Sequence, residues 1–218
     1  MGTPSRPELL TAASAAVRPL LTGDPRRLLV GLAGPPAAGK STLSLALAAA
    51  FRAERGERAA VAVPMDGFHL SNMELARLGL SHRKGAPETF DVGGFAGLLR
   101  RLRDEHDAIV YAPSFNRTIN ESIGSDIPIF PETGLVVVEG NYLLLTTGAW
   151  AGVRPLLDLV IYIETPDPVR VSSLLRRQRA RGLADTEAQD WVHRSDEANA
   201  RLIEKTRDHA DLILTRRN

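Results

Sequence analysis

The sequence predicts an α/β fold of three layers, in which a five-stranded parallel sheet lies between helices on both faces. Short apolar runs alternate with longer helical stretches along the 218 residues, an alternation typical of parallel sheets. The first run leads directly into a glycine-rich loop and a helix, and a later run ends in a glutamate. With 44% hydrophobic residues, residues 1–218 are expected to form a single domain.

The N-terminal part is expected to contain a helix, a strand and a second helix. Residues 7–21 place apolar side chains near helical spacing, and residues 23–25 (GDP) end that stretch. We interpret it as a helix that packs ahead of the sheet. Residues 28–33 (LLVGLA) are typical of a buried strand, and residues 41–52 (STLSLALAAAFR) are typical of a helix.

A phosphate-binding loop joins this strand and helix. Residues 34–41 (GPPAAGKS) match the pattern G-x-x-x-x-G-K-[ST] without a mismatch. The glycines allow backbone angles that other residues avoid, so consecutive amides can turn toward one anion. Lys40 adds positive charge near the β- and γ-phosphates, and the Ser41 hydroxyl can bind Mg²⁺, while the following helix points its positive end at the phosphates. The sequence therefore predicts a nucleoside triphosphate site formed by Gly34, Pro35, Pro36, Ala37, Ala38, Gly39, Lys40, Ser41 and Thr42.

The middle of the chain is expected to add a strand, a helix and two irregular excursions. Residues 59–63 (AAVAV) predict the second buried strand, and residues 91–103 predict an amphipathic helix. Residues 70–89 are polar and are expected to be a partly helical excursion. Residues 108–111 are a short strand candidate, whereas residues 114–131 are expected to be a loop-rich segment with a functional role.

The C-terminal part is expected to complete the sheet. Residues 135–138, 159–163 and 212–214 are apolar runs, interpreted as the third, fourth and fifth core strands. Residues 168–181 and 185–208 are expected to be helical, and the first of these stretches is strongly basic.

Composition narrows the classes of function. A formal net charge of +1 argues against bulk electrostatic binding to nucleic acid or to an anionic membrane. The sequence also lacks a membrane-length apolar stretch, a signal-peptide pattern and any cysteine. We therefore expect a cytoplasmic protein that binds neither nucleic acid nor a membrane, and a homodimer is the default expectation for its assembly.

Two acidic residues are expected to lie beside the phosphate-binding loop. Glu139 ends the run LVVV, and Asp66 follows the second strand. Ligands of parallel sheets bind beyond the carboxyl ends of the strands, so both residues should share one cleft with the loop. Glu139 is placed like a carboxylate that orients Mg²⁺. Asp66 is placed like one that accepts or orients the proton of an attacking hydroxyl.

Three segments in this order, GPPAAGKST, MDGFHL and VVVEGNYLL, resemble the P-loop kinases grouped with phosphoribulokinase, uridine kinase and bacterial pantothenate kinase. Residues 83–91 (RKGAPETFD) and 203–214 (IEKTRDHADLIL) are also similar to that family. The resemblance covers residues 28–214 and implies a P-loop NTPase fold. It also implies ATP- and Mg²⁺-dependent transfer of the γ-phosphate to a hydroxyl of a small molecule. PMDGFHL and VVVEGNYLLL look most similar to a bacterial branch variously labelled nucleoside, pantothenate-like or fructose kinases.

The resemblance also implies roles for single residues. Asp66 would activate the acceptor, while Ser41 and Glu139 would serve Mg²⁺, with Asp66 as a further candidate ligand. Residues 111–117 (YAPSFNR) resemble the family's substrate loop, but Phe-Asn stands here in place of the usual Tyr-Asp. Insertions at about 66–95 and about 112–131 are expected to hold the acceptor. The candidate substrate-binding residues are Asp66, His69, Arg83, Lys84, Arg117 and Asn141.

A small arginine-rich lid is implied at about residues 168–185. A lid arginine neutralises charge on the transferring phosphoryl group, and closure of a lid excludes water. The predicted catalytic residues are Asp66, Lys40 and Arg176, and the sequence leaves open which arginine of the lid acts. The other arginines of the lid are Arg170, Arg177, Arg179 and Arg181. A solvated helix face in an arginine-rich chain is the alternative interpretation.

The sequence leaves the acceptor open, because nucleosides, sugars and pantothenate-like molecules all present a hydroxyl to an aspartate. A phosphorylated acceptor is a further alternative, for which Arg83, Lys84 and Arg117 could supply charge. The alternative function is a regulatory NTPase that hydrolyses ATP or GTP without a small acceptor. The chain lacks an N-K-x-D guanine-specificity motif, which favours the kinase.

Overall fold

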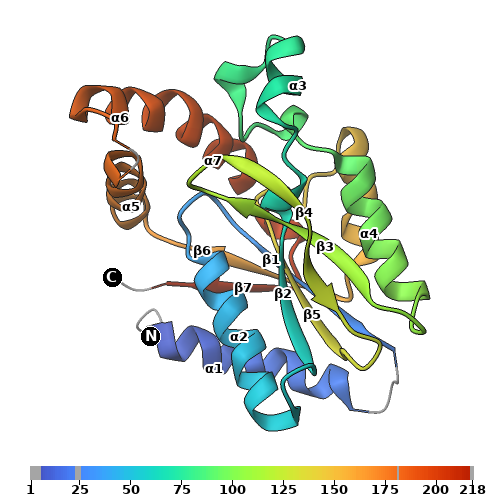
Figure 1. Cartoon of the computed structure of the whole chain (residues 1–218). Coiled ribbons are helices and arrows are strands. Elements are labelled where there is room, and N and C mark those ends of the chain that lie inside the picture. The colour runs from blue at the N-terminus through green and yellow to red at the C-terminus, as the bar shows by residue number, and fades with distance from the viewer. Residues whose placement is uncertain (1–5, 23–25, 181, 217–218) are drawn as a thin grey trace.

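The computed structural model describes residues 6–22, 26–180 and 182–216, and its elements follow the predicted alternation (Figure 1). The predicted helix break at 23–25 and the lid residue Arg181 lie outside the described residues. Short 3₁₀ turns and a π-helical turn join some of the elements. The helices and strands are α1 (Arg6–Val17), β1 (Leu28–Ala33), α2 (Lys40–Arg55), β2 (Ala60–Pro64), α3 (Asn72–Arg77), α4 (Val92–Asp104), β3 (Val110–Asn116), β4 (Glu121–Ile129), β5 (Leu135–Glu139), β6 (Leu159–Glu164), α5 (Asp167–Ala180), α6 (Asp185–Trp191), α7 (Glu197–Glu204) and β7 (Leu212–Thr215).

The central sheet is parallel and has the strand order β2-β5-β1-β6-β7. Every residue of β1 and of β5 is buried, because helices cover both faces of these strands. Strands buried on both faces are continuous apolar runs in sequence, which is why the five core strands were predictable. The predicted five-stranded parallel sheet is confirmed.

Alternate strand residues face two separate cores. Val30, Val137 and Ile161 pack with α1 and α2 on one face of the sheet. Leu29 and Val136 pack with α4 on the other face. Figure 1 shows the same arrangement, with the sheet between α1 and α2 on one side and α4 on the other. The predicted three layers are therefore confirmed.

The prediction of a loop-rich segment at residues 114–131 is wrong, because β3 and β4 form an antiparallel hairpin outside the main sheet. Val110 and Ile129 are buried at its base, but most of β4 is exposed or half-buried. A largely solvent-facing hairpin needs no apolar run, so its strands left little signal in the sequence. The hairpin packs against the turn after β2, where a Cβ on Gly67 would collide with the carbonyl oxygen of Pro113.

The helical predictions hold with one interruption. The excursion at 70–89 contains α3 and two 3₁₀ turns, and the basic stretch forms α5. The stretch 185–208 is divided into α6, a π-helical turn at Val192–Asp196, α7 and a 3₁₀ turn. Among the described residues, no helix combines the length and apolar character needed to span a membrane.

Candidate active site

The loop between β1 and α2 has backbone angles that its glycines permit. Gly34 and Gly39 have positive φ values of 145° and 100°. A Cβ on Gly34 would lie 2.5 Å from the carbonyl oxygen of Ile163, so glycine allows the loop to rest against β6. Beyond β6, Thr165 Oγ1 donates a hydrogen bond of 2.9 Å to the carbonyl oxygen of Ala38. The loop is thus fixed to a neighbouring strand, and the sequence did not reveal the part of Thr165.

Lys40 is buried in this loop, with only 5% of its surface exposed. Its Nζ donates to the carbonyl oxygens of Gly34 at 2.8 Å and Pro35 at 3.0 Å. Burial lowers the pKa of Lys40 to about 8, and the nearby carboxylates of Glu139 and Asp66 oppose that shift. A phosphate group near Nζ would favour the charged form, so the residue is suited to bind a triphosphate.

Ser41 and Glu139 meet at the carboxyl end of the sheet. Ser41 Oγ donates to Glu139 Oε1 at 2.7 Å, and Glu139 is only 7% exposed. Burial raises the pKa of Glu139, and the charge of Asp66 raises it further. A buried carboxylate beside a hydroxyl fits a magnesium ion that is otherwise held by phosphates and water. Among the described residues, no group of three or more His, Cys, Asp or Glu side chains is placed to hold a metal.

Asp66 lies in the 3₁₀ turn Met65–Phe68 that follows β2 directly. Its Oδ2 lies 3.3 Å from Nη2 of Arg117, which the hairpin brings from 51 residues further along the chain. The Arg117 side chain is half exposed, so its guanidinium can contact a ligand as well as Asp66. The pair therefore gives the cleft both a proton acceptor and a cation.

His69 is held next to Asp66 between two aromatic rings. Its ring centroid lies 4.0 Å from that of Phe90 and 4.8 Å from that of Phe115. Burial lowers the pKa of His69, so the imidazole is neutral near pH 7. Nδ1 lies 2.7 Å from the carbonyl oxygen of Asp66. Because a carbonyl can only accept, Nδ1 carries the proton and Nε2 is left as an acceptor.

Lys84 links the two segments that were expected to hold the acceptor. Its Nζ donates to Asn72 Oδ1 at 2.5 Å and to the carbonyl oxygen of Asn120 at 2.6 Å, while Glu121 lies 3.8 Å away. The ammonium also lies 5.4 Å from the centroid of the Phe115 ring. Lys84 thus connects α3 to the end of the β3–β4 hairpin.

One cleft of about 1070 Å³ joins these groups. Among the predicted residues, those that line it are Pro36, Ala37, Gly39, Lys40, Ser41, Thr42, Asp66, His69, Lys84, Arg117, Glu139 and Asn141. Gly34, Pro35 and Ala38 lie in the same loop but do not line the cleft. The lining residues that the sequence did not single out as site residues include Asn72, Ser81, Phe90, Gln178, Trp191, Asp196, Asn199 and Arg216.

Two predicted arginines lie away from the cleft. Arg83 is half exposed and forms an ion pair with Glu88. Arg176 is exposed on α5, and its Nη2 lies 3.3 Å from Ser173 Oγ. The next residue, Arg177, points about 100° further round the helix and lines the cleft. The arginine that α5 presents to the cleft is therefore Arg177 rather than Arg176.

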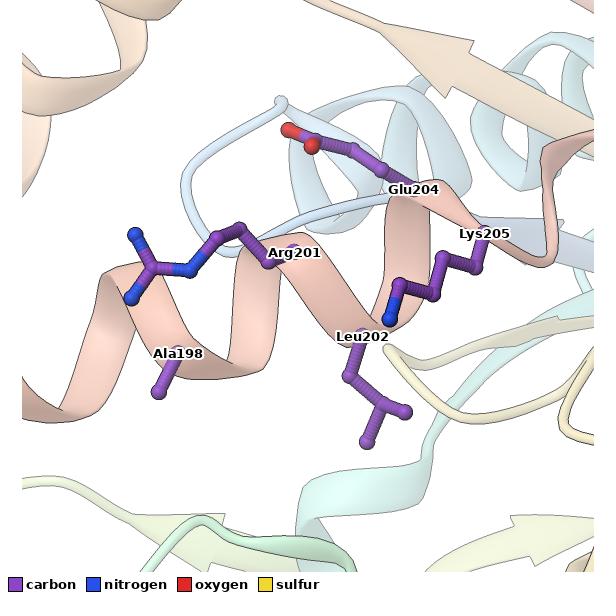
Figure 2. Close-up of a pocket in the computed structure, with 5 residues that line it drawn as sticks. All are labelled: Ala198, Arg201, Leu202, Glu204 and Lys205. Atoms are coloured by element: carbon purple, nitrogen blue, oxygen red, sulfur yellow. The ribbon is translucent and has the colours of Figure 1, made fainter.

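A second hollow, of about 630 Å³, lies over α7 and is open to solvent. Figure 2 shows the five residues that line it, Ala198, Arg201, Leu202, Glu204 and Lys205, as sticks along α7 and directly after it. All five come from one short stretch of helix, and none is a predicted site residue. The hollow shares no lining residue with the larger cleft, which is the candidate active site.

The fold and this cleft define a P-loop kinase. The model of the Phosphoribulokinase / Uridine kinase family matches residues 29–218, and the chain belongs to that family. The resemblance noted in the sequence is thereby confirmed. Membership makes the protein a small-molecule kinase, an enzyme that phosphorylates an alcohol group.

Individual relatives are similar to this chain over most of its length. The chain is 35% identical over 195 residues to a Schizosaccharomyces pombe protein named "Putative uridine kinase C227.14", covering 87% of this chain and 83% of that one. It is 33% identical over 189 residues to YggC of Escherichia coli, covering 87% and 78% of the two chains. Among solved structures, a "putative fructose transport system kinase" from Silicibacter sp. TM1040 is 40% identical and superposes with a TM-score of 0.85. That match covers 94% of this chain and 98% of the other.

Proposed function

We propose that this kinase transfers the γ-phosphate of ATP, with Mg²⁺, to a hydroxyl group of a small polar acceptor such as a nucleoside, a sugar or a pantothenate-like molecule. One observation carries the proposal: Asp66 lines the same cleft as Lys40 and Ser41 of the phosphate-binding loop. A carboxylate for the acceptor hydroxyl and a cradle for the donor phosphates are the two parts that phosphoryl transfer requires.

The donor side is formed by the loop and the start of α2. Its backbone amides and the Lys40 ammonium would contact the β- and γ-phosphates of ATP. Ser41 and Glu139 would hold Mg²⁺, which neutralises phosphate charge when it is bound. Lys40 would exchange its present partners, the carbonyl oxygens of Gly34 and Pro35, for phosphate oxygens.

On the acceptor side, Asp66 would accept a hydrogen bond from the reacting hydroxyl. As the bond from the hydroxyl oxygen to the γ-phosphorus forms, the bond from that phosphorus to the bridging oxygen of ADP breaks. The hydroxyl proton passes to Asp66. Arg117 fixes the direction of the carboxylate, and Nε2 of His69 offers a nearby acceptor for a second hydroxyl of the substrate.

Arg177 is the lid residue best placed to stabilise the transferring phosphoryl group. Its guanidinium lines the cleft, and among the described residues its buried Nε finds no hydrogen-bond partner. Lys40 is close enough for the charge of Arg177 to lower its pKa. Phosphate oxygens of the donor would supply the acceptor that Nε lacks.

The acceptor side of the cleft carries the cations of Lys84 and Arg117 beside the carboxylate of Asp66, and the rings of Phe90 and Phe115 also line it. Asn72, Asn120 and Asn141 contribute amide groups to its lining, and Lys84 and Arg117 contribute the charges. Such a lining suits an acceptor with several hydroxyl or carbonyl groups. The names of the relatives, which include a uridine kinase, pantothenate kinases and a fructose transport system kinase, define the first compounds to test.

A thermal-shift screen followed by an activity assay tests the proposal. Purified protein with Mg²⁺ and a nonhydrolysable ATP analogue is heated with nucleosides, sugars and pantothenate in turn. A true acceptor raises the melting temperature, because it binds the native state. The same compound should then release ADP from ATP in a coupled assay. The proposal is overturned if no compound in these three classes is phosphorylated.

A further inference from the structure

The helical stretch that follows the lid helix contains a π-helical turn, Val192–Asp196, between α6 and α7. On a regular α-helix, at about 100° per residue, Trp191 and Asp196 would point about 140° apart. In the structure both line the active-site cleft, together with Asn199 one turn later. A π-turn closes i to i+5 hydrogen bonds and so brings residues five apart onto one face. The turn therefore places Asp196 in the cleft.

Asp196 is 7% exposed, and it lies against the side of α5 that faces the cleft. Its Oδ1 lies 3.7 Å from Nη2 of Arg177, and its Oδ2 is 3.4 Å from the donor Nε2 of Gln178. Gln178 is itself 2% exposed. The carboxylate thus lies next to a fixed amide group and next to a cation that extends from α5 into the cleft.

Arg177 forms an ion pair with Asp196, but its buried Nε donates no hydrogen bond within the described part of the chain. Its side chain is 35% exposed, and the 3.7 Å separation makes an ion pair rather than a short hydrogen bond. A guanidinium held from one side with donors unused on another is set to receive an anionic group in the cleft.

We propose that Asp196 is a positioning residue for Arg177, holding the guanidinium over the phosphate-binding loop so that its free donors meet the transferring phosphoryl group. This inference rests on the proposed function, in which Arg177 contacts that group. A long arginine side chain loses rotamer freedom when it is ordered. Because Asp196 orders the Arg177 side chain already in the folded protein, this entropy is not lost again during phosphoryl transfer. The π-turn places Asp196 where it can do so.

The test is a double-mutant cycle. Asp196→Asn keeps the size of the side chain and an oxygen for Gln178 but removes the charge. It is expected to lower kcat about tenfold, with each KM changed less than about twofold. Arg177→Met alone should lower kcat roughly 10²–10³-fold, as removal of one transition-state donor does. Combined, the two changes should be no slower than R177M, because Asp196 acts through Arg177. Asp190→Asn, an exposed carboxylate on α6, is the matched control and should leave kcat unchanged.

Each other outcome has a definite meaning. Multiplicative losses in the double variant, or an unchanged or raised kcat in D196N, would overturn the positioning role while leaving the proposed function intact. Wild-type kcat in R177M would overturn the part given to Arg177 and this inference with it. If D196N does not melt cooperatively, Asp196→Ser is carried through the same cycle on the R177M background. Asp196→Glu, which keeps the charge, should restore most of the kcat lost in D196N.

Discussion

The donor and acceptor halves of the cleft are built in different ways. In the donor half, one contiguous loop supplies most of the contacts, and Lys40 bonds to carbonyls five and six residues away. Glu139 and Thr165 reach this loop from the ends of neighbouring strands, 98 and 127 residues along the chain. The acceptor half depends on side chains brought from distant segments. Asp66 and Arg117 are 51 residues apart, and Lys84 and Asn120 are 36 apart.

Because of this difference, triphosphate binding and acceptor recognition depend on separate parts of the structure. A triphosphate is the same in every P-loop kinase, and a rigid loop fixed to β1 and β6 can bind it by its backbone. The acceptor half lies on an insertion and an exposed hairpin, which can change side chains without disturbing the sheet. Substitutions should therefore affect ATP binding and acceptor binding separately, and four experiments test whether they do.

The largest effect is expected from Asp66→Asn. Loss of the proton acceptor should lower kcat roughly 10²–10⁴-fold, which is the usual contribution of a positioned general base. Affinity for ATP, measured by calorimetry, should be unchanged because the loop is untouched. Asp126→Asn, on the exposed part of β4, is the matched control and should behave like wild type. A comparable loss of ATP affinity in D66N would show that the donor and acceptor halves are not independent.

The second effect is a pH dependence of the free energy of unfolding, measured without nucleotide, that arises from Lys40 in the donor half. The pKa of Lys40 is about 8 in the folded protein and 10.5 ordinarily. Between these values the unfolded state binds more protons, so the Lys40 contribution to the free energy of unfolding rises with pH. The rise should be on the order of 3 kcal/mol over the whole window. Urea unfolding of wild type and Lys40→Met at pH 7 to 10.5 isolates this contribution. Parallel curves for the two proteins would contradict it.

The third effect is expected from Lys84→Met, which removes the link between α3 and the hairpin. The acceptor KM should rise about tenfold, equivalent to about 1.4 kcal/mol, while the affinity for ATP stays constant. Lys205→Met, at an exposed position beyond α7, is the control. Equal effects of the two lysine substitutions would remove Lys84 from the acceptor half.

The smallest effect is expected from Thr165→Val, which deletes the hydrogen bond to the carbonyl oxygen of Ala38. A net loss of about 1 kcal/mol should weaken ATP binding about fivefold, with the acceptor KM unchanged. The exposed Thr146→Val serves as the control. An effect on the acceptor KM instead of ATP affinity would reverse the assignment of Thr165 to the donor half.

The same comparison explains what could be predicted from the sequence. The order of strands and helices and the loop at 34–42 were predictable, because continuous apolar runs and a contiguous motif are local signals. The hairpin was missed because β4 faces solvent along most of its length. Glu139 could be singled out because it ends a buried strand, whereas Asp66 was singled out mostly through the resemblance to the kinase family.

Residues that reach the cleft through tertiary packing were beyond sequence reasoning. Arg176 and Arg177 are adjacent in the chain, and the rotation of α5 decides which of them meets the cleft. Asp196 depends on a π-turn whose position no periodicity revealed. Thr165 follows β6 and donates a hydrogen bond to Ala38 in the loop after β1, so its partner depends on the order of strands in the sheet.

The most direct test of the account is a ³¹P NMR spectrum of the enzyme incubated with ATP, Mg²⁺ and a compound selected by the thermal-shift screen. A phosphomonoester resonance and ADP should appear in equal amounts, and with D66N both should appear at least about 10²-fold more slowly. Release of inorganic phosphate alone, at the same rate with and without the compound and in D66N, would contradict the central claim that one cleft joins a donor half to an acceptor half.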